Sequence, residues 1–123
     1  TNMAARVQEG QASVTVPPGV FCNPDHGLDR DLTLCCIEAF RLHVGRKVSY
    51  SELYAGSGLR VLRVLREAGQ HVSTVLANEK DTHALSCIKE NCASNNVPVT
   101  PVPSSEVDVR PGGGHSCMGE LVT

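Results

Sequence analysis

The N-terminal third of the chain changes from strand-like alternation to helix-like spacing of its apolar residues. Residues 1–10 form a polar lead-in, and residues 12–16 (Ala-Ser-Val-Thr-Val) alternate in the way typical of a short strand. The Pro-Pro-Gly sequence at 17–19 ends that strand, and a loop is expected to follow up to residue 28.

A helix is predicted over residues 29–44. Asp29 or Asp31 can cap its start, and Gly45 suits the position just past its end. Apolar residues recur at every fourth position along it, at Leu32, Cys36, Phe40 and Val44. Such a stripe faces the core in a surface helix.

Strands and helices alternate from residue 47 onward. The pattern predicts a strand at 47–54, a helix at 59–68, a strand at 72–78, a helix at about 82–93 and a weaker strand at 97–102. Asp81 suits the N-cap of the helix at 82–93, whereas Pro98 and Pro101 weaken the strand at 97–102. This alternation indicates an α/β fold with a parallel sheet, whose ligands bind at the carboxyl ends of the strands.

The 123 residues are enough for one domain or part of one. About three core parallel strands can be recognised, so we expect residues 1–102 to form a partial α/β unit. Residues 103–123 contain Ser-Ser, Pro-Gly-Gly-Gly and little periodicity, and we expect a flexible tail there. The chain begins with Thr-Asn rather than Met, as expected of a piece of a longer protein.

Composition excludes several classes of protein. The formal charge of −2 and the pI near 6.2 argue against a generally basic nucleic-acid binder, so we expect no DNA partner. No apolar run is long enough to span a membrane. The six cysteines show no Cys-x-x-Cys motif and no zinc-site spacing with histidine, which predicts reduced, mostly buried thiols of an intracellular protein and no metal site.

The most informative local signal is the turn Gly56-Ser57-Gly58, which follows an apolar strand and opens a helix. Glycine lets a backbone approach a bound nucleoside, and Glu79, at the end of the next strand, can accept hydrogen bonds from a ribose. Val61 stands where a dinucleotide-binding motif has its third glycine. A pyrophosphate site is therefore disfavoured, and S-adenosylmethionine is the favoured cofactor.

Two charged residues suit the amino-acid end of that cofactor. Glu52, near the end of a strand, could bind its amino group. Arg30 lies at the start of a helix, where the helix dipole disfavours a cation. This position makes sense if Arg30 pairs with a carboxylate, such as that of the methionine moiety.

Several short segments occur in a distinctive order and spacing over roughly residues 7–97. They are Phe-Cys-Asn-Pro at 21–24, Arg-Asp-Leu-Thr at 30–33, Glu-Leu-Tyr-Ala-Gly-Ser-Gly-Leu-Arg at 52–60, Ala-Asn-Glu at 77–79 and Ile-Lys-Glu-Asn at 88–91. Together they resemble the N-terminal half of the tRNA guanine-N2 dimethyltransferase family, nearer to its dimethyltransferase-like paralogues.

This resemblance implies a Rossmann-like class I methyltransferase fold, S-adenosylmethionine as the methyl donor and a guanine N2 amine in tRNA as the acceptor. By motif match, Arg30 would bind the methionine carboxylate and Glu79 the ribose hydroxyls. Gly56, Ser57 and Gly58 would line the cofactor turn, Arg60 would support it, and Asn78 would approach the adenine side. Nucleus, cytoplasm and mitochondrion all stay open as compartments.

The sequence also departs from the family. Cys22 stands where Tyr is usual and Glu79 where Asp is usual. No Asp-Pro dipeptide occurs, so the family's Asp-Pro-Phe/Tyr-Gly catalytic loop is absent, and we assign no catalytic residue. We expect a truncated form that is inactive alone. The alternative is a non-catalytic module that binds S-adenosylmethionine, another nucleoside or tRNA; a dehydrogenase fragment is disfavoured by Val61 and Arg60.

Arginines recur at every third position of the predicted helix at 59–68, at Arg60, Arg63 and Arg66. Further cations occur in the sequence at Arg41, Arg46 and Lys47. A solvated face is the favoured interpretation, because phosphate binding would require such residues to cluster in three dimensions.

Overall fold

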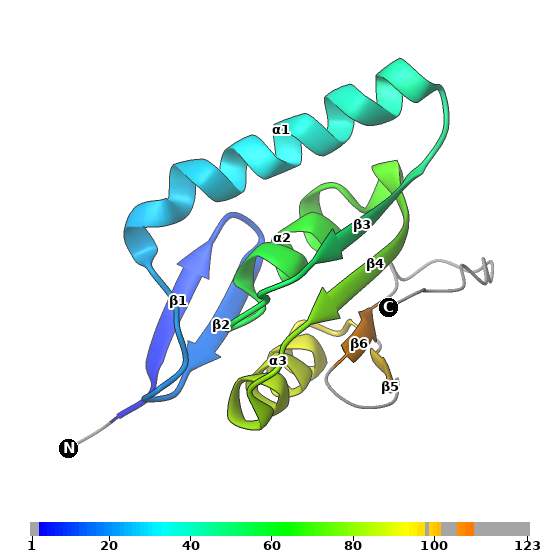
Figure 1. Ribbon diagram of the computed structural model, residues 1–123. Coiled ribbons are helices and arrows are strands. Elements are labelled where there is room, and N and C mark those ends of the chain that lie inside the picture. The colour runs from blue at the N-terminus through cyan, green and yellow to red at the C-terminus, as the bar shows by residue number, and fades with distance from the viewer. Residues whose placement is uncertain (1–2, 98, 102–105, 110–123) are drawn as a thin grey trace.

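The computed structural model describes residues 3–97, 99–101 and 106–109. Two sheets and three α-helices make up this part of the chain (Figure 1). In chain order the elements are β1 (Ala5–Glu9), β2 (Ala12–Val16), the 3-10 turn η1 (Pro24–His26), α1 (Gly27–Val44), β3 (Val48–Glu52), α2 (Leu59–Glu67), the 3-10 turn η2 (Gly69–His71), β4 (Val72–Asn78), α3 (Thr82–Ser94), β5 (Val99–Pro101) and β6 (Glu106–Val109).

The N-terminal lead-in is a strand, which the sequence pattern did not predict. β1 and β2 form an antiparallel hairpin in which Glu9 pairs with Ala12 across a two-residue turn. Gly10 has a φ of 54°, a conformation that such tight turns require and that glycine adopts at little cost. β1 is largely exposed and carries one half-buried valine, so the alternation that reveals a strand is missing there.

The main sheet has the order β3-β4-β6-β5, and only β3 and β4 are parallel neighbours. The prediction of about three parallel strands is confirmed only in part: β3, β4 and β5 run in the same direction, but β6 lies between β4 and β5 and pairs antiparallel with both. β5 takes the edge of the sheet, where Pro101, which has no N–H to donate, is tolerated. β6 lies within the expected tail, where its Glu-Val-Asp-Val sequence has the alternation typical of a strand. The rest of that tail lies outside the described residues.

Helix α1 turns a different face to the core from the one its spacing predicted. Leu32, Cys36 and Phe40 are exposed, whereas Arg30 and Ile37 are buried. The buried face is the one on which Arg30 reaches Glu9 of β1, and burying a paired guanidinium fixes the rotation of the helix. Its end is as predicted, because Gly45 has a left-handed conformation and its N–H donates to the Arg41 carbonyl.

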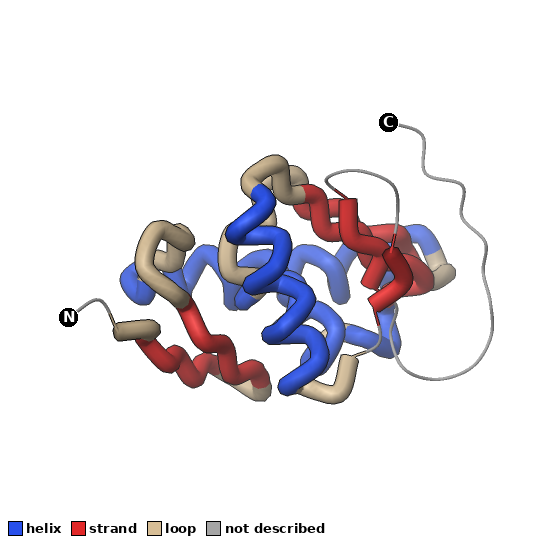
Figure 2. The backbone as a smooth tube through the Cα atoms, turned by 90° about the horizontal axis from the view of Figure 1, so that it is seen from below, coloured by secondary structure: helices blue, strands red, loops and turns tan. Residues whose placement is uncertain are grey.

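Helix α2 lies between the N-terminal hairpin and the main sheet, contacting both β2 and β4 (Figure 1). Figure 2 shows helices between the strands of the hairpin and those of the main sheet. Its aliphatic residues are almost completely buried. The largest fully buried side chains of the core come from β2, α2, β4 and α3: Val14, Val61, Leu62, Val64, Val72, Val75, Ile88 and Cys92. Aliphatic packing therefore supplies most of the hydrophobic stabilisation in a chain with few aromatic residues.

Asn91 of α3 and Asn95, the residue that caps the end of this helix, bind the outer edge of β2 in place of a further strand. Asn91 Oδ1 accepts from Thr15 N at 2.9 Å, and Asn91 Nδ2 donates to the Thr15 carbonyl at 3.1 Å. One helical turn later, Asn95 repeats this pairing with Ser13. Because residues i and i+4 share a helix face and alternate strand residues share an edge, the two amides match the spacing of the strand.

The structure tests the predicted state of the cysteines in the described ranges. Cys22, Cys35, Cys36, Cys87 and Cys92 are free thiols. Cys87 and Cys92 are buried, but Cys35 and Cys36 are exposed. The prediction of mostly buried thiols is therefore confirmed only in part. None of the helices seen here is long and apolar enough to cross a membrane.

We predict that Asn91→Ala lowers the free energy of unfolding by about 2–4 kcal/mol, because it leaves the buried Ser57 carbonyl and the partly buried Thr15 N–H without their partner. Urea unfolding followed by circular dichroism measures this change. Glu90→Ala, on the exposed side of the same helix, is the control and should change stability little. Equal stability of the two variants would contradict the role of Asn91.

Candidate cofactor site

The carboxyl end of β3 leads into a tight turn that opens α2. Gly58 N donates to the Ala55 carbonyl at 2.9 Å, and Gly56 and Gly58 have φ angles of 56° and 83°. Residues with a side chain rarely adopt these φ angles, so the turn itself requires the two glycines. Ala55 N donates to the Asn78 carbonyl, which joins the turn to the end of β4. The turn therefore lies at the carboxyl edge of the parallel pair, as the sequence predicted.

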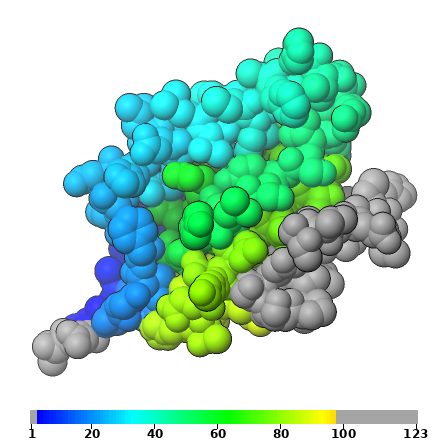
Figure 3. All heavy atoms as spheres, viewed as in Figure 1, coloured from blue at the N-terminus to red at the C-terminus, as the bar shows by residue number. Residues whose placement is uncertain are grey.

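A cleft opens between this turn and the segment that precedes α1, which Figure 3 shows in blue to cyan beside the green surface of the turn. The cleft encloses about 440 Å³, including the part that opens to solvent. Its lining consists of Phe21, Cys22, Asn23, His26, Arg30, Glu52, Tyr54, Ala55, Gly56, Ser57, Leu59 and Arg60. Five of the sequence-predicted site residues are thus brought together: Arg30, Glu52, Gly56, Ser57 and Arg60.

The other three predicted residues, Gly58, Asn78 and Glu79, lie behind the lining. Glu79 Oε2 accepts a hydrogen bond from Gly56 N at 2.9 Å, and its Oε1 accepts one from Asp81 N at 3.0 Å. The Asn78 carbonyl accepts the hydrogen bond from Ala55 N that joins the turn to β4. These contacts give Glu79 a structural role, because it holds the glycine turn against the end of β4.

Glu52 is a buried carboxylate at the bottom of the cleft, only 8% exposed. The Tyr50 hydroxyl donates to Glu52 Oε1 at 2.8 Å, and Arg60 Nε lies 3.8 Å from the same oxygen. Burial raises the pKa of Glu52 to about 7, although the Tyr50 hydrogen bond and the Arg60 charge both act to lower it. The same burial raises the pKa of Tyr50. Glu52 therefore titrates close to neutral pH.

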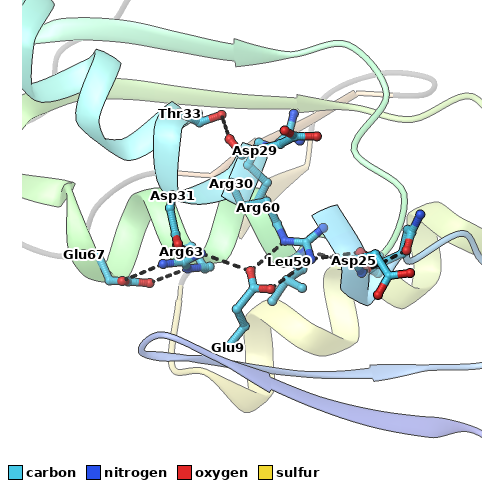
Figure 4. Close-up of polar contacts among 12 residues, drawn as sticks. Glu9, Asp25, Asp29, Arg30, Asp31, Thr33, Leu59, Arg60, Arg63 and Glu67 are labelled. Atoms are coloured by element: carbon cyan, nitrogen blue, oxygen red, sulfur yellow. Dashed lines mark hydrogen bonds and ion pairs between the residues drawn. The ribbon is translucent and has the colours of Figure 1, made fainter. Parts of the chain in front are cut away.

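Arg30 reaches the cleft from the first turn of α1 and is held there by Glu9 of β1 (Figure 4). Arg30 Nε and Nη2 donate to the two Glu9 oxygens at 2.6 and 2.9 Å, and Nη2 also donates to the Asn23 carbonyl. This pairing lowers the pKa of Glu9 and raises that of Arg30. No hydrogen bond among the described residues uses Nη1, which leaves this nitrogen for a ligand.

The same Glu9 carboxylate also binds a second buried arginine. Arg63 Nη1 lies 3.0 Å from Glu9 Oε2 and 2.6 Å from Asp31 Oδ1, and Arg63 Nε donates to Glu67 at 2.8 Å. Figure 4 shows these contacts as one chain of ion pairs from β1 through α1 to α2. Arg63 is only 5% exposed, so the arginines at every third position of α2 do not form a solvated stripe.

Sequence reasoning missed the residues that support the site from a distance. Glu9 is one of them, and its partner Arg30 lies 21 residues away along the chain. Asn91 donates to the Ser57 carbonyl at 2.9 Å and so fixes the glycine turn from behind. No local sequence pattern predicts either the Glu9–Arg30 pair or the Asn91–Ser57 hydrogen bond. The one available hint was Arg30 itself, because a cation at a helix start is unfavourable unless a carboxylate pairs with it.

The described fold and cleft define an α/β protein with a cleft lined by charged residues at the carboxyl end of the parallel strands, the place where nucleotide-type ligands bind in such sheets. Within the described residues, no group of three His, Cys, Asp or Glu side chains could hold a metal ion. The chain belongs to the N2,N2-dimethylguanosine tRNA methyltransferase family, whose model matches residues 2–110.

Relatives of known function agree with this assignment. The tRNA (guanine(26)-N(2))-dimethyltransferase of Methanothermobacter thermautotrophicus is 32% identical over 99 residues, which cover 74% of this chain and 26% of the relative. The tRNA (guanine(26)-N(2)/guanine(27)-N(2))-dimethyltransferase of Aquifex aeolicus is 34% identical over 101 residues, covering 75% of this chain and 26% of the relative. The matched region thus spans about a quarter of the length of these relatives.

We predict that Glu9→Gln lowers the free energy of unfolding by about 3 kcal/mol at pH 7, because it leaves two buried guanidinium groups with one carboxylate fewer. The lowered pKa values of Glu9 and Glu67 give stability that is present above pH 4.5 and is lost as the pH falls through the folded values. Acid unfolding of the variant should therefore depend less on pH. Glu38→Gln, an exposed carboxylate of α1, is the control; a matching loss there would argue against the Glu9 cluster.

Glu52 has the opposite pH dependence. Its folded pKa of about 7 lies above the ordinary 4.5, so its contribution to stability is full below pH 4.5 and is lost as the pH rises through 7. We predict that Glu52→Gln removes this decline, which amounts to at most about 3 kcal/mol. Urea unfolding at pH 5, 6.5 and 8 measures it, with Glu90→Gln as the exposed control. Parallel pH profiles for wild type and Glu52→Gln would refute the raised pKa.

Proposed function

We propose that the cleft binds S-adenosylmethionine and that this chain forms the cofactor-binding part of a tRNA guanine-N2 methyltransferase. The observation that supports this most strongly is the placement of one buried carboxylate and two guanidinium groups beside a glycine turn at the end of a parallel strand. An amino acid carries a cation and an anion on one carbon, and this arrangement offers a partner of opposite charge to each.

The residues present fit the methionine end of the cofactor. Glu52 would accept from the ammonium group, and its titration near neutral pH makes that contact pH-dependent. Arg30 Nη1 would donate to the carboxylate, with Glu9 orienting the guanidinium. Arg60 Nε is buried and has no hydrogen-bond partner among the described residues, so a ligand oxygen there would satisfy it.

The glycine turn suits the nucleoside end. Gly56 and Ser57 present backbone to the cleft without bulky side chains, and Gly58 sets the turn that opens α2. Glu79 already accepts two backbone N–H groups, but a carboxylate has about four acceptor sites, so it can also accept from ribose hydroxyls. Asn78 would approach the adenine side. In this proposal the unit β3–α2–β4 belongs to a Rossmann-like class I methyltransferase fold.

S-adenosylmethionine supplies an electrophilic methyl group for transfer to the N2 amine of guanine. The part of this chain is to bind and orient the cofactor through Arg30, Glu52 and the turn, while the tRNA supplies the acceptor. Transfer also needs acceptors for the amine protons. Because the sequence contains no Asp-Pro catalytic motif, we propose that the chain alone binds the cofactor without turnover.

Calorimetric titration of S-adenosylmethionine into the purified chain tests the proposal. We predict saturable binding that Arg60→Gln weakens about tenfold, since one charge-assisted contact is lost. Binding should also tighten as the pH rises from 6 to 8, because Glu52 becomes charged, and Glu52→Gln should remove this dependence.

Arg66→Gln is the matched control, because Arg66 lies on the same helix, is exposed and lies outside the cleft lining. Its affinity should equal that of the wild type. Absence of binding by a chain that circular dichroism shows to be folded would overturn the cofactor assignment. Equal weakening by Arg60→Gln and Arg66→Gln would instead indicate a nonspecific charge effect.

A further inference from the structure

Three of the Lys and Arg residues in the described ranges pair with a carboxylate, and the others, which include Arg41, Arg46 and Lys47, do not. Arg30, Arg60 and Arg63 each form an ion pair with a carboxylate. Arg41, Arg46 and Lys47 take part in none of the ion pairs found in the described part of the chain. The sequence from residue 39 to residue 51 contains these three cations and no Asp or Glu. Positive charge therefore stays uncompensated over this segment.

The tertiary structure gathers these cations at one end of the molecule. Arg41 lies in the last turn of α1, and Arg46 and Lys47 form the link to β3. Val48 pairs with Val72 across the parallel strands, so the residues just before them, Lys47 and His71, are neighbours as well. Helix α1 also contacts η2, which contains His71. Figure 1 shows the end of α1 beside the start of β3 and β4.

Two buried polar atoms in this region have no partner. Arg41 Nε and His71 Nδ1 are both shielded from solvent and form no hydrogen bond with the described residues. A buried polar group without a partner costs free energy, so such a pair on two contacting elements indicates a missing ligand group. Offsetting the helix dipole accounts for Arg41 but not for Arg46 and Lys47, which lie past the helix end.

We propose that Arg41, Arg46, Lys47 and His71 form a second binding site, which takes phosphate groups of an RNA backbone. Phosphate oxygens accept hydrogen bonds from guanidinium, ammonium and imidazole donors, and such contacts carry little sequence information. The site lies at the amino end of β3, whereas the cleft lies at the carboxyl end. Five strand residues separate them by about 16 Å.

This separation gives the site a distinct role. A base that reacts in the cleft belongs to one nucleotide, and a contact at the opposite end of the strands must reach a different part of the same RNA. The inference rests on the proposed function, because it takes tRNA as the partner. It predicts that the two sites can be disabled separately.

Fluorescence anisotropy with a labelled, unmodified tRNA transcript tests the proposal on the full chain. We predict that Arg46→Gln combined with Lys47→Gln weakens binding about tenfold at low salt and lowers the slope of log K against log salt by about 1 to 2. Calorimetric affinity for S-adenosylmethionine should stay as in the wild type, because neither residue lines the cleft. Arg6→Gln combined with Lys89→Gln, an equal change of charge at exposed positions elsewhere, is the control.

The outcomes separate this inference from the proposed function. Selective weakening by the Arg46 and Lys47 changes supports the second site. Unchanged tRNA affinity in that variant, or equal weakening in the control, overturns the second site while the cofactor assignment stands. Absence of tRNA binding by the wild-type chain overturns both the second site and the tRNA part of the proposed function.

Discussion

The carboxylate of Glu9 lies between two buried guanidinium groups, and the arrangement of three elements depends on it. Arg30 brings α1 to this carboxylate, and Arg63 brings α2. Burying one unpaired charge would cost several kcal/mol, so the three elements are stable together only in this relative position. The cleft follows from it, because Arg30 enters the lining with one nitrogen still unused.

A second constraint acts from behind the cleft. Asn91 binds both the edge of β2 and the Ser57 carbonyl, so the hairpin, α3 and the glycine turn share one buried amide. Glu79 adds two hydrogen bonds that hold the turn against β4. The turn thus has its conformation before any ligand arrives, which reduces the entropy lost on binding.

Charge is used differently at the two ends of the parallel strands. At the carboxyl end, Glu52 is buried beside Tyr50 and Arg60, where a low-dielectric environment would strengthen contacts to the small zwitterion proposed as the ligand. At the amino end, Arg46 and Lys47 are exposed and have no carboxylate partner among the described residues. Exposed cations suit a large polyanion, whose binding is governed by the release of counterions.

Features that depend on neighbouring residues could be predicted from the sequence. The glycine turn, the strand and helix order from residue 47 to 94, the Asp81 cap and the Gly45 helix end all follow from local backbone chemistry, and the motif order identified the family. Tertiary structure decided the rest. The buried face of α1, the insertion of β6 beside β4 and the engagement of Glu79 with the turn depend on partners far along the chain. Local periodicity cannot report such partners, because ion pairing and edge pairing are settled only when the elements meet.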